Sequence, residues 1–203
     1  MTSIDKRIIR DYIKLTLSLI VSIIYTPHVL IYLTIRGDKI SSDIKSMFSR
    51  LPIHLSGIIG LIYLLNTNGY FRTLFYHRIG PIASAFISWY RPGDKYFTIS
   101  KTTKIGRSVI LAHPYATILN AESIGDNFNF RHLTTLGDKN GKRPVIGNNV
   151  SLGACVTIIG GVKIGDNVVV GAGSVVVKDV PDNCIIAGNP AKIIRTISQC
   201  QNC

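Results

Sequence analysis

IGNNVS-LGACVT-IIGGVK-IGDNVV-VGAGSV, residues 146–175, repeats its pattern every six residues. Each six-residue unit opens with an aliphatic residue, and a small residue often follows it. A period of six suits neither an α-helix nor a long strand, but it is typical of a solenoid of parallel β-coils with three units to a coil. Equivalent residues of successive coils then stack, so we expect Ile146 to lie over Ile164.

The repeat extends from Ile105 to about Ile194 and predicts a mainly β domain over residues 98–195. Glycines take the second place of many units, and we expect them to give the backbone the freedom that sharp corners need; they are Gly147, Gly153, Gly165 and Gly171. A β-sandwich with glycine-rich turns is the alternative, but it does not explain a constant phase over about a dozen units.

Four segments carry a resemblance to a known family: IGRSVILAH, LTTLGDKNGKRPVIGNNVSLGACV, IGDNVVVGAGSVVVKDVP and AGNPAKIIR. They resemble the hexapeptide-repeat acyltransferases, in particular serine acetyltransferases and the relatives that acetylate capsular or exopolysaccharide sugars. The resemblance covers roughly the C-terminal half of the chain. It implies a left-handed parallel β-helix, a homotrimer and acetyl-CoA as co-substrate. The handedness rests on the resemblance alone, because parallel crossovers are generally right-handed.

Acetyl transfer to a hydroxyl group needs a base that accepts the proton while the oxygen attacks the thioester, and histidine suits this role at neutral pH. The resemblance places the family's catalytic histidine at His113, at the end of IGRSVILAH. A corner histidine bonded to the backbone is the competing structural interpretation. We predict that His113 is the general base.

Two positions depart from the serine acetyltransferase pattern. Thr98 stands where the family has the aspartate that orients the catalytic histidine, and Arg143 replaces a loop histidine implicated in gripping serine. Both changes favour a sugar hydroxyl over serine as the acceptor. His132, in FRHLTT, falls one coil beyond His113, and we assign it and Arg143 to the acceptor side.

The resemblance also implies where the acyl donor binds. In the family, the pantetheine arm contacts small residues at corners between neighbouring subunits, and the matching residues are Gly153, Ala154, Gly171 and Ala172. Small residues let the backbone approach a ligand closely. Lys192, in GNPAKIIR, is expected near the nucleotide phosphates as a point charge, although a solvated surface lysine is an equal alternative.

Residues 1–97 are apolar and basic, lack the repeat, and predict a separate helical region. The uncharged segment 15–35 is long enough to cross a bilayer, but one crossing would separate the catalytic half from cytoplasmic acetyl-CoA. Pro27 favours a break within it. We therefore expect attachment to the cytoplasmic face of a bacterial inner membrane, peripheral or re-entrant. The alternative is a cytoplasmic protein whose helices cap the solenoid; the apolar stretch 51–65 is too short for an ordinary crossing.

The chain carries 23 basic and 11 acidic residues, a net charge of +12. Basic residues beside apolar helices bind anionic lipid surfaces, and positive charge also suits the phosphates of acetyl-CoA or an acidic polysaccharide. Nucleic acid is the competing partner of a basic protein. Neither a basic run nor a nucleic-acid motif supports it, so we predict no nucleic-acid binding.

The four cysteines do not form a disulfide framework in a chain of 203 residues. Cys155 and Cys184 fall within the repeat, where we expect small apolar fillers. Cys200 and Cys203 lie in a polar tail, residues 196–203, for which we expect no structure.

Together these features predict an acetyl-CoA-dependent O-acetyltransferase acting on a sugar or lipid-linked oligosaccharide of a capsule, exopolysaccharide or lipopolysaccharide precursor. Serine O-acetylation is the first alternative. A zinc enzyme is the second, but related β-helices bind zinc through three histidines, whereas this repeat offers His113 and His132, so we expect no metal. A non-catalytic scaffold is the third.

Overall fold

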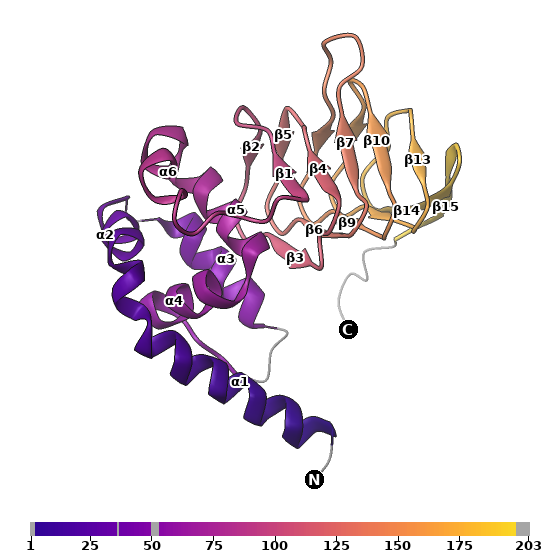
Figure 1. Ribbon diagram of the computed structural model, residues 1–203. Helices are drawn as coiled ribbons and strands as arrows, with labels where there is room; N and C mark the ends of the chain where they lie inside the picture. Colours follow the sequence, from indigo (N-terminus) through magenta and orange to yellow (C-terminus); the bar gives the residue numbers. More distant parts are fainter. Residues whose placement is uncertain (1–2, 36, 50–52, 198–203) are drawn as a thin grey trace. The chain divides into compact units, whose positions relative to one another are not determined.

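The computed structural model describes residues 3–35, 37–49 and 53–197, and the chain forms two compact units, Met1–Asp94 and Lys95–Cys203 (Figure 1). The first unit is helical, and the second consists of short strands. Residues 95–97, placed in the helical region by the sequence, belong to the strand-containing unit because its first strand already begins at Phe97.

The described residues of the first unit form α1 Ser3–Ile20, the 3-10 helix η1 Ser22–Tyr25, α2 Thr26–Ile35, α3 Asp38–Phe48, α4 Gly57–Thr67, α5 Gly69–Ile79 and α6 Pro81–Ile87. Helix α4 forms the centre, because it contacts α1, α2, α3 and α5 and buries every residue from Gly60 to Leu65. The apolar stretch 51–65 is therefore core from Gly60 to Leu65, whereas Ile58 and Ile59 in the first turn of α4 are exposed. The next helix, α5, begins at an asparagine cap, since the Asn68 side chain accepts from Phe71 N at 3.0 Å.

The apolar segment 15–35 is bent, but the bend does not lie at Pro27. Helix α1 ends at Ile20, η1 follows, and Pro27 sits in the first turn of α2. Proline is tolerated there because the amide it lacks has no partner within a first helical turn. The predicted break within the segment is present, and it lies at residues 21–25, shortly before Pro27. No single described helix is long and apolar enough to cross a membrane, whereas the pair Ile9–Ile20 and Ser22–Ile35, bent by 68°, passes by length and composition.

A buried polar cluster ties this unit together around His28. The ring is fully buried, with Nε2 3.0 Å from the Tyr76 hydroxyl and Nδ1 3.2 Å from the Tyr90 hydroxyl. Burial, followed by the charges of Arg72 and Arg91, lowers the pKa of His28 to about 4. The imidazole is therefore neutral at pH 7 and belongs to the core of the helical unit.

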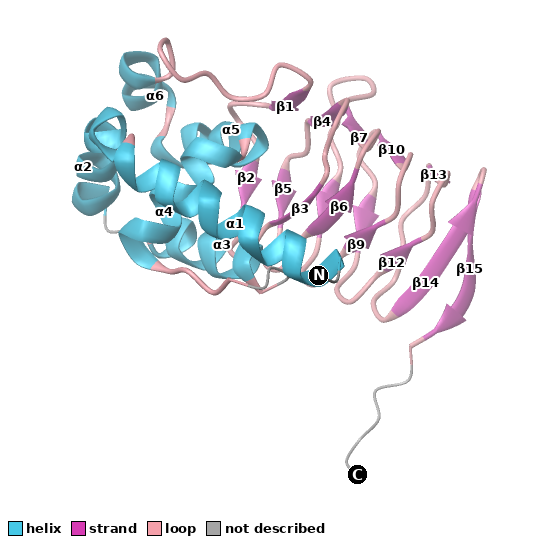
Figure 2. Ribbon diagram, turned by 60° about the horizontal axis from the view of Figure 1, so that its bottom comes forward, coloured by secondary structure: helices cyan, strands magenta, loops and turns pink. Residues whose placement is uncertain are grey.

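The second unit is a three-sided solenoid (Figure 2). One sheet contains β1 Phe97–Ile99, β4 Thr117–Leu119, β7 Thr135–Gly137, β10 Thr157–Ile159 and β13 Val175–Val176. The second contains β2 Lys104–Ile105, β5 Ser123–Ile124, β8 Val145–Ile146 and β11 Lys163–Ile164. The third contains β3 Ile110–Ala112, β6 Asn129–Arg131, β9 Ser151–Leu152, β12 Val169–Val170, β14 Cys184–Gly188 and β15 Ala191–Thr196.

Neighbouring coils pair in parallel, and the final strand β15 pairs antiparallel with β14. Ile146 and Ile164 are in register, which confirms the predicted stacking. Inward side chains of the parallel strands fill the interior, including the fully buried Phe130, Leu136 and Ile158. The strands are two to six residues long because each coil must turn three times.

Close packing between coils explains the glycines at the corners. Gly147, Gly153, Gly165 and Gly171 are not among the residues with positive φ, so the expectation that they provide backbone freedom is wrong. A Cβ atom on Gly153 would lie 2.6 Å from the Ala172 nitrogen, and one on Gly147 would lie 2.7 Å from the Gly165 carbonyl carbon. Glycine is required there because the next coil leaves no room for a side chain.

Asparagines hold the left-handed positions of one corner. Asn127, Asn149, Asn167 and Asn183 have φ between 56° and 58°. The side-chain amides of the first three each donate to the next asparagine, at 2.8 to 2.9 Å, and Asn183 is the last acceptor. Asparagine adopts this conformation more readily than most residues, so the ladder links successive coils with little backbone strain.

The C-terminal end of the solenoid includes Thr196, and most of the predicted tail, with Cys200 and Cys203, lies outside the described residues. Cys184 is buried, as expected of an apolar filler. Cys155 is exposed, so the same prediction is wrong for it. Its φ of 60° places it at a corner, where inward packing is not available.

Candidate active site

His113 occupies an enlarged corner of the solenoid, between β3 and β4. The pairing of β3 with β6 joins Ala112 to Arg131, an offset of 19 residues, whereas β4 and β7 join Leu119 to Leu136, an offset of 17. The first coil therefore has two more residues at this corner than the next coil. His113, in this longer turn, is exposed and has a left-handed φ of 56°.

Backbone contacts hold this turn and leave the imidazole accessible. Tyr115 N donates to His113 O at 2.8 Å, and Leu133 N of the next coil donates to Tyr115 O at 2.9 Å. The rings of Tyr96 and Tyr115 pack 5.1 Å apart. Over residues 3–35, 37–49 and 53–197, no hydrogen bond fixes the His113 ring, so both ring nitrogens are available to a substrate or to another subunit.

His132 lies at the same corner, one coil further along. Because Arg131 pairs with Ala112, His132 follows directly above the enlarged turn. Its carbonyl oxygen accepts from Cys155 N at 3.0 Å, and its side chain is exposed. The structure thus brings His113 and His132, both predicted site residues, to one corner on adjacent coils.

The backbone of this corner is more strained than that of the asparagine corner. Ala116, Leu133 and Cys155 have φ between 50° and 60°, a region that these residue types rarely adopt. Each such residue costs on the order of 1 kcal/mol, and positions of this kind cluster at functional sites.

Beyond His132, the corner becomes a row of small residues. Gly153 N donates to Val170 O and Gly171 N donates to Ile186 O, both at 2.8 Å, so the coils stack closely. Ala172 is exposed and Ala154 is half-buried. A ligand can lie against the backbone here without meeting a long side chain.

The row ends at a cation. A Cβ atom on Gly171 would lie 2.9 Å from the Ala187 Cβ, and Ala187 pairs with Lys192 across β14 and β15. Lys192 is exposed. The residues predicted to bind the donor therefore lie along one edge, with a positive charge at its far end.

Arg143 lies at a different corner of the same chain. It belongs to the loop between β7 and β8, where Lys139 and Lys142 exchange backbone hydrogen bonds of 3.0 and 3.1 Å around a tight Asn-Gly turn. Its Nη1 donates to Thr102 Oγ1 at 2.7 Å. The loop borders a pocket of about 670 Å³ that is also lined by Ile159, Gly160, Gly161, Val162, Val177 and Asp179.

Thr98, which replaces the expected aspartate, lies in β1 opposite Ile118 of β4. Both side chains are exposed on the outer face of that sheet. This position holds a hydroxyl group rather than a carboxylate, so it cannot stabilise an imidazolium by charge.

Residues 143–178 match the family model described as "Bacterial transferase hexapeptide (six repeats)". Over 168 residues the chain is 30% identical to the serine acetyltransferase of Synechococcus elongatus, an alignment that covers 76% of this chain and 67% of that protein. The chain belongs to the hexapeptide-repeat transferase family. Its solenoid is the left-handed parallel β-helix that the sequence resemblance predicted.

The chain is also similar to a second curated protein and to a solved structure. The Escherichia coli protein named "Putative colanic acid biosynthesis acetyltransferase WcaB" is 42% identical over 101 residues, which is 48% of this chain and 62% of WcaB. A crystal structure of Neisseria gonorrhoeae serine acetyltransferase in complex with serine matches with a TM-score of 0.65 and 29% identity, covering 81% of this chain and 73% of that one. The chain covers 30% to 62% of the length of the first curated relatives.

Two features of the corner that holds His113 and His132 were not predicted from the sequence. Tyr96 and Tyr115 form a ring pair beside the His113 turn, with Lys95 Nζ 4.7 Å from the centre of the Tyr96 ring. Arg131, exposed directly before His132, adds a second charge. The enlargement itself had a signal, because the six-residue phase is interrupted at Thr117.

Proposed function

We propose that this chain is an acetyl-CoA-dependent O-acetyltransferase in which His113 is the general base. The observation that carries the proposal is an exposed imidazole at an enlarged corner, on the same edge as a row of small residues ending in Lys192. The relatives named above are acetyltransferases by name, which supports the same class of reaction.

In the proposed reaction, the hydroxyl oxygen of the acceptor attacks the thioester carbonyl carbon while a nitrogen of His113 accepts the hydroxyl proton. A carbon–oxygen bond forms, the carbon–sulfur bond breaks, and the imidazolium returns the proton to the departing sulfur. The products are an acetyl ester and the free thiol of CoA. A base in this role contributes about 100- to 10,000-fold to the rate.

The proposed assembly is a homotrimer, because one chain does not bring all predicted site residues together. His113 and Arg143 lie at different corners, and a prism packed against a second copy brings a different corner of that copy to the His113 edge. Arg143 and the group that orients the His113 ring then come from a neighbouring subunit.

For the acceptor, we favour a sugar hydroxyl of an envelope polysaccharide precursor, free or lipid-linked. Thr98 in place of an aspartate and Arg143 in place of a histidine separate this chain from the serine acetyltransferase pattern. The loop also exposes Lys139 and Lys142, and a cationic loop suits a carboxylated or phosphorylated sugar. The likeness to WcaB supports the same acceptor class.

Serine is the second candidate, and several comparisons favour it. The Synechococcus elongatus relative, of which the chain covers 67%, is a serine acetyltransferase by name. The crystal structure with bound serine is also that of a serine acetyltransferase. Arg143 offers a chemical route, because a guanidinium group binds a carboxylate such as that of serine in a bidentate manner.

Thiol release from acetyl-CoA by the purified full-length chain distinguishes these candidates. The acceptors are L-serine, neutral sugars, uronic acids and a lipid-linked oligosaccharide fraction, each at equal concentration. Release with the sugars or the oligosaccharide and not with serine supports the favoured acceptor. Release with serine alone makes the chain a serine acetyltransferase, and release with none of the acceptors contradicts acetyl transfer to a hydroxyl group of these classes.

A further inference from the structure

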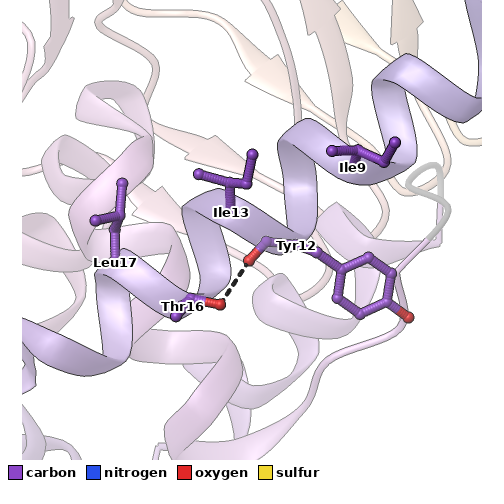
Figure 3. A pocket seen from close by; sticks show the side chains of 5 residues that line it. All are labelled: Ile9, Tyr12, Ile13, Thr16 and Leu17. Atoms are coloured by element: carbon purple, nitrogen blue, oxygen red, sulfur yellow. Dashed lines mark hydrogen bonds between the residues drawn. The ribbon is translucent and has the colours of Figure 1, made fainter.

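Helix α1 carries its apolar side chains on its exposed face. Ser18 is fully buried and Asp11 is 6% exposed, whereas Ile9, Ile13, Leu17 and Ile20 are between 47% and 70% exposed. Figure 3 shows Ile9, Ile13 and Leu17 projecting from α1, where they line a shallow groove of about 370 Å³ with Tyr12 and Thr16. A helix of a soluble protein normally buries its apolar stripe against other elements. The apolar stripe of α1 is exposed instead.

The exposed apolar surface continues past the end of α1. Ile23 in η1 is 80% exposed. Tyr90 donates from its hydroxyl group to Ile24 O at 2.9 Å, which brings the segment after α6 against η1. Trp89, in that segment, is 78% exposed. Ile82 and Phe86 of α6 are exposed to a similar degree. We name the set Ile9, Tyr12, Ile13, Leu17, Ile20, Ile23, Ile82, Phe86 and Trp89 the apolar rim.

Two threonine hydroxyl groups near the rim are satisfied within the chain. Thr16 Oγ1 donates to Tyr12 O at 3.1 Å, as Figure 3 shows, and Thr26 Oγ1 donates to Ile23 O at 2.8 Å. These bonds turn the hydroxyl groups back to the helical backbone, which reduces the cost of placing them in an apolar phase that offers no hydrogen-bond partner.

The charges beside the rim are positive. Among the described side chains of α1, the exposed charges are Arg10 and Lys14, and the described acid of the helix, Asp11, is buried. On a helix with 3.6 residues per turn, Arg10 and Lys14 lie along one side of the Ile13 and Leu17 stripe, where their aliphatic stems can follow it toward lipid phosphates. A second copy placed on this face would instead bring these cations together, which disfavours self-association.

We infer that the apolar rim is a docking surface for an anionic lipid bilayer, in which α1 lies in the interfacial plane with Ile13 and Leu17 toward the acyl chains and Arg10 and Lys14 toward the phosphates. Tryptophan is enriched at this depth of membranes, which fits Trp89. Because acetyl-CoA is cytoplasmic, the proposed function places this bilayer on the cytoplasmic side. The docking surface itself does not depend on the acyltransferase activity.

Vesicle flotation of the full-length chain, without acyl donor, tests the inference. Vesicles of phosphatidylglycerol are compared with vesicles of phosphatidylcholine, at low and at high salt. The wild-type chain is expected to float with the anionic vesicles at low salt and to release partly at high salt, because screening weakens its cationic contacts. A chain that stays at the bottom of the gradient with phosphatidylglycerol vesicles overturns the inference.

Two paired variants identify the surface. Ile13→Ser with Leu17→Ser is expected to lower partitioning at least about tenfold, while the control Val169→Ser with Val177→Ser, exposed residues of the solenoid, leaves it unchanged. Arg10→Ser with Lys14→Ser should lower binding to phosphatidylglycerol about tenfold, unlike the control Lys104→Ser with Lys163→Ser, which removes the same charge from the solenoid.

Far-UV circular dichroism and sedimentation velocity accompany each variant. A folded Ile13→Ser with Leu17→Ser variant that still floats like the wild type contradicts the inference. If the same variant keeps its vesicle binding but forms a smaller particle, the rim is an interface between copies of the chain, which also overturns the proposal.

Discussion

At the residue scale, His113 lies in a turn that is two residues longer than the equivalent turn of the next coil. The two additional residues of its turn separate it from the regular stack, and the rest of the corner stays in register through backbone bonds such as Leu133 N to Tyr115 O. Along the same edge, the residues are glycine and alanine, because the coils pack too closely to leave room for larger side chains. The edge therefore combines the proposed base with a smooth surface along the proposed path of the acyl donor.

Ala172→Leu is expected to raise KM for acetyl-CoA about tenfold or more while the melting temperature stays unchanged. Ala172 is exposed, so a larger side chain fits without disturbing the core, but it occupies the proposed path of the pantetheine arm. Steady-state kinetics with acetyl-CoA as the varied substrate measures the effect. Ala85→Leu, the same change at an exposed alanine of α6, serves as the control, and equal KM values for Ala172→Leu and the wild type would contradict this donor path.

His28 is expected to make the helical unit acid-sensitive. Its pKa is about 4 in the folded protein against 6.5 in an unfolded chain. Between these values the unfolded state binds a proton that the folded state does not, so stability is complete above pH 6.5 and falls by about 3 kcal/mol as the pH drops to 4. Urea unfolding at pH 7 and at pH 4.5 measures the loss.

The variant His28→Gln separates this effect from general acid denaturation. Glutamine keeps a donor and an acceptor for Tyr76 and Tyr90 but does not titrate, so the loss between pH 7 and pH 4.5 should shrink by about 2 kcal/mol. His54→Gln, at an exposed position, is the matched control. An unchanged loss in His28→Gln would show that other groups cause the acid sensitivity.

At the element scale, the asparagine ladder stabilises the solenoid by linking successive coils at one corner. Asn149→Ala removes two side-chain hydrogen bonds and places alanine at a φ of 56°, so the protein should lose about 1–2 kcal/mol of stability. Asn149→Gly loses the same bonds without the backbone strain and should lose less. Urea unfolding followed by far-UV circular dichroism gives the order, and an alanine variant as stable as the glycine variant contradicts the strain argument.

The period of six was sufficient to predict the solenoid and its register, because a buried residue in each unit must face the axis, as Ile146 and Ile164 do. The helical unit was harder to predict. Pro27 indicated a break within segment 15–35, but not that the chain turns at residues 21–25 and that Pro27 lies in the first turn of the next helix. Cys155 failed as a core prediction because its place in the unit falls on a left-handed corner. Which face of α1 is buried could not be predicted from its amphipathic pattern, because the burial of Asp11 and Ser18 depends on contacts with other helices.

At the scale of the whole molecule, the separation of His113 from Arg143 predicts complementation between inactive variants. His113→Ala and Arg143→Ala should each be impaired, and the mixed, refolded proteins should regain activity in roughly a quarter of their sites, where a wild-type His113 meets a wild-type Arg143 from the neighbouring subunit. The assay is thiol release by the mixture against each variant alone. Recovery that never exceeds the sum of the separate variants would place both residues in one subunit's site.

Thiol release from acetyl-CoA, measured for the wild type and for His113→Ala with the acceptor that the wild type prefers, tests directly whether His113 is the base. Turnover of His113→Ala is expected to fall by at least about 100-fold, with far-UV circular dichroism and sedimentation identical to those of the wild type. A folded His113→Ala variant that turns over as fast as the wild type would contradict the assignment of His113 as the base.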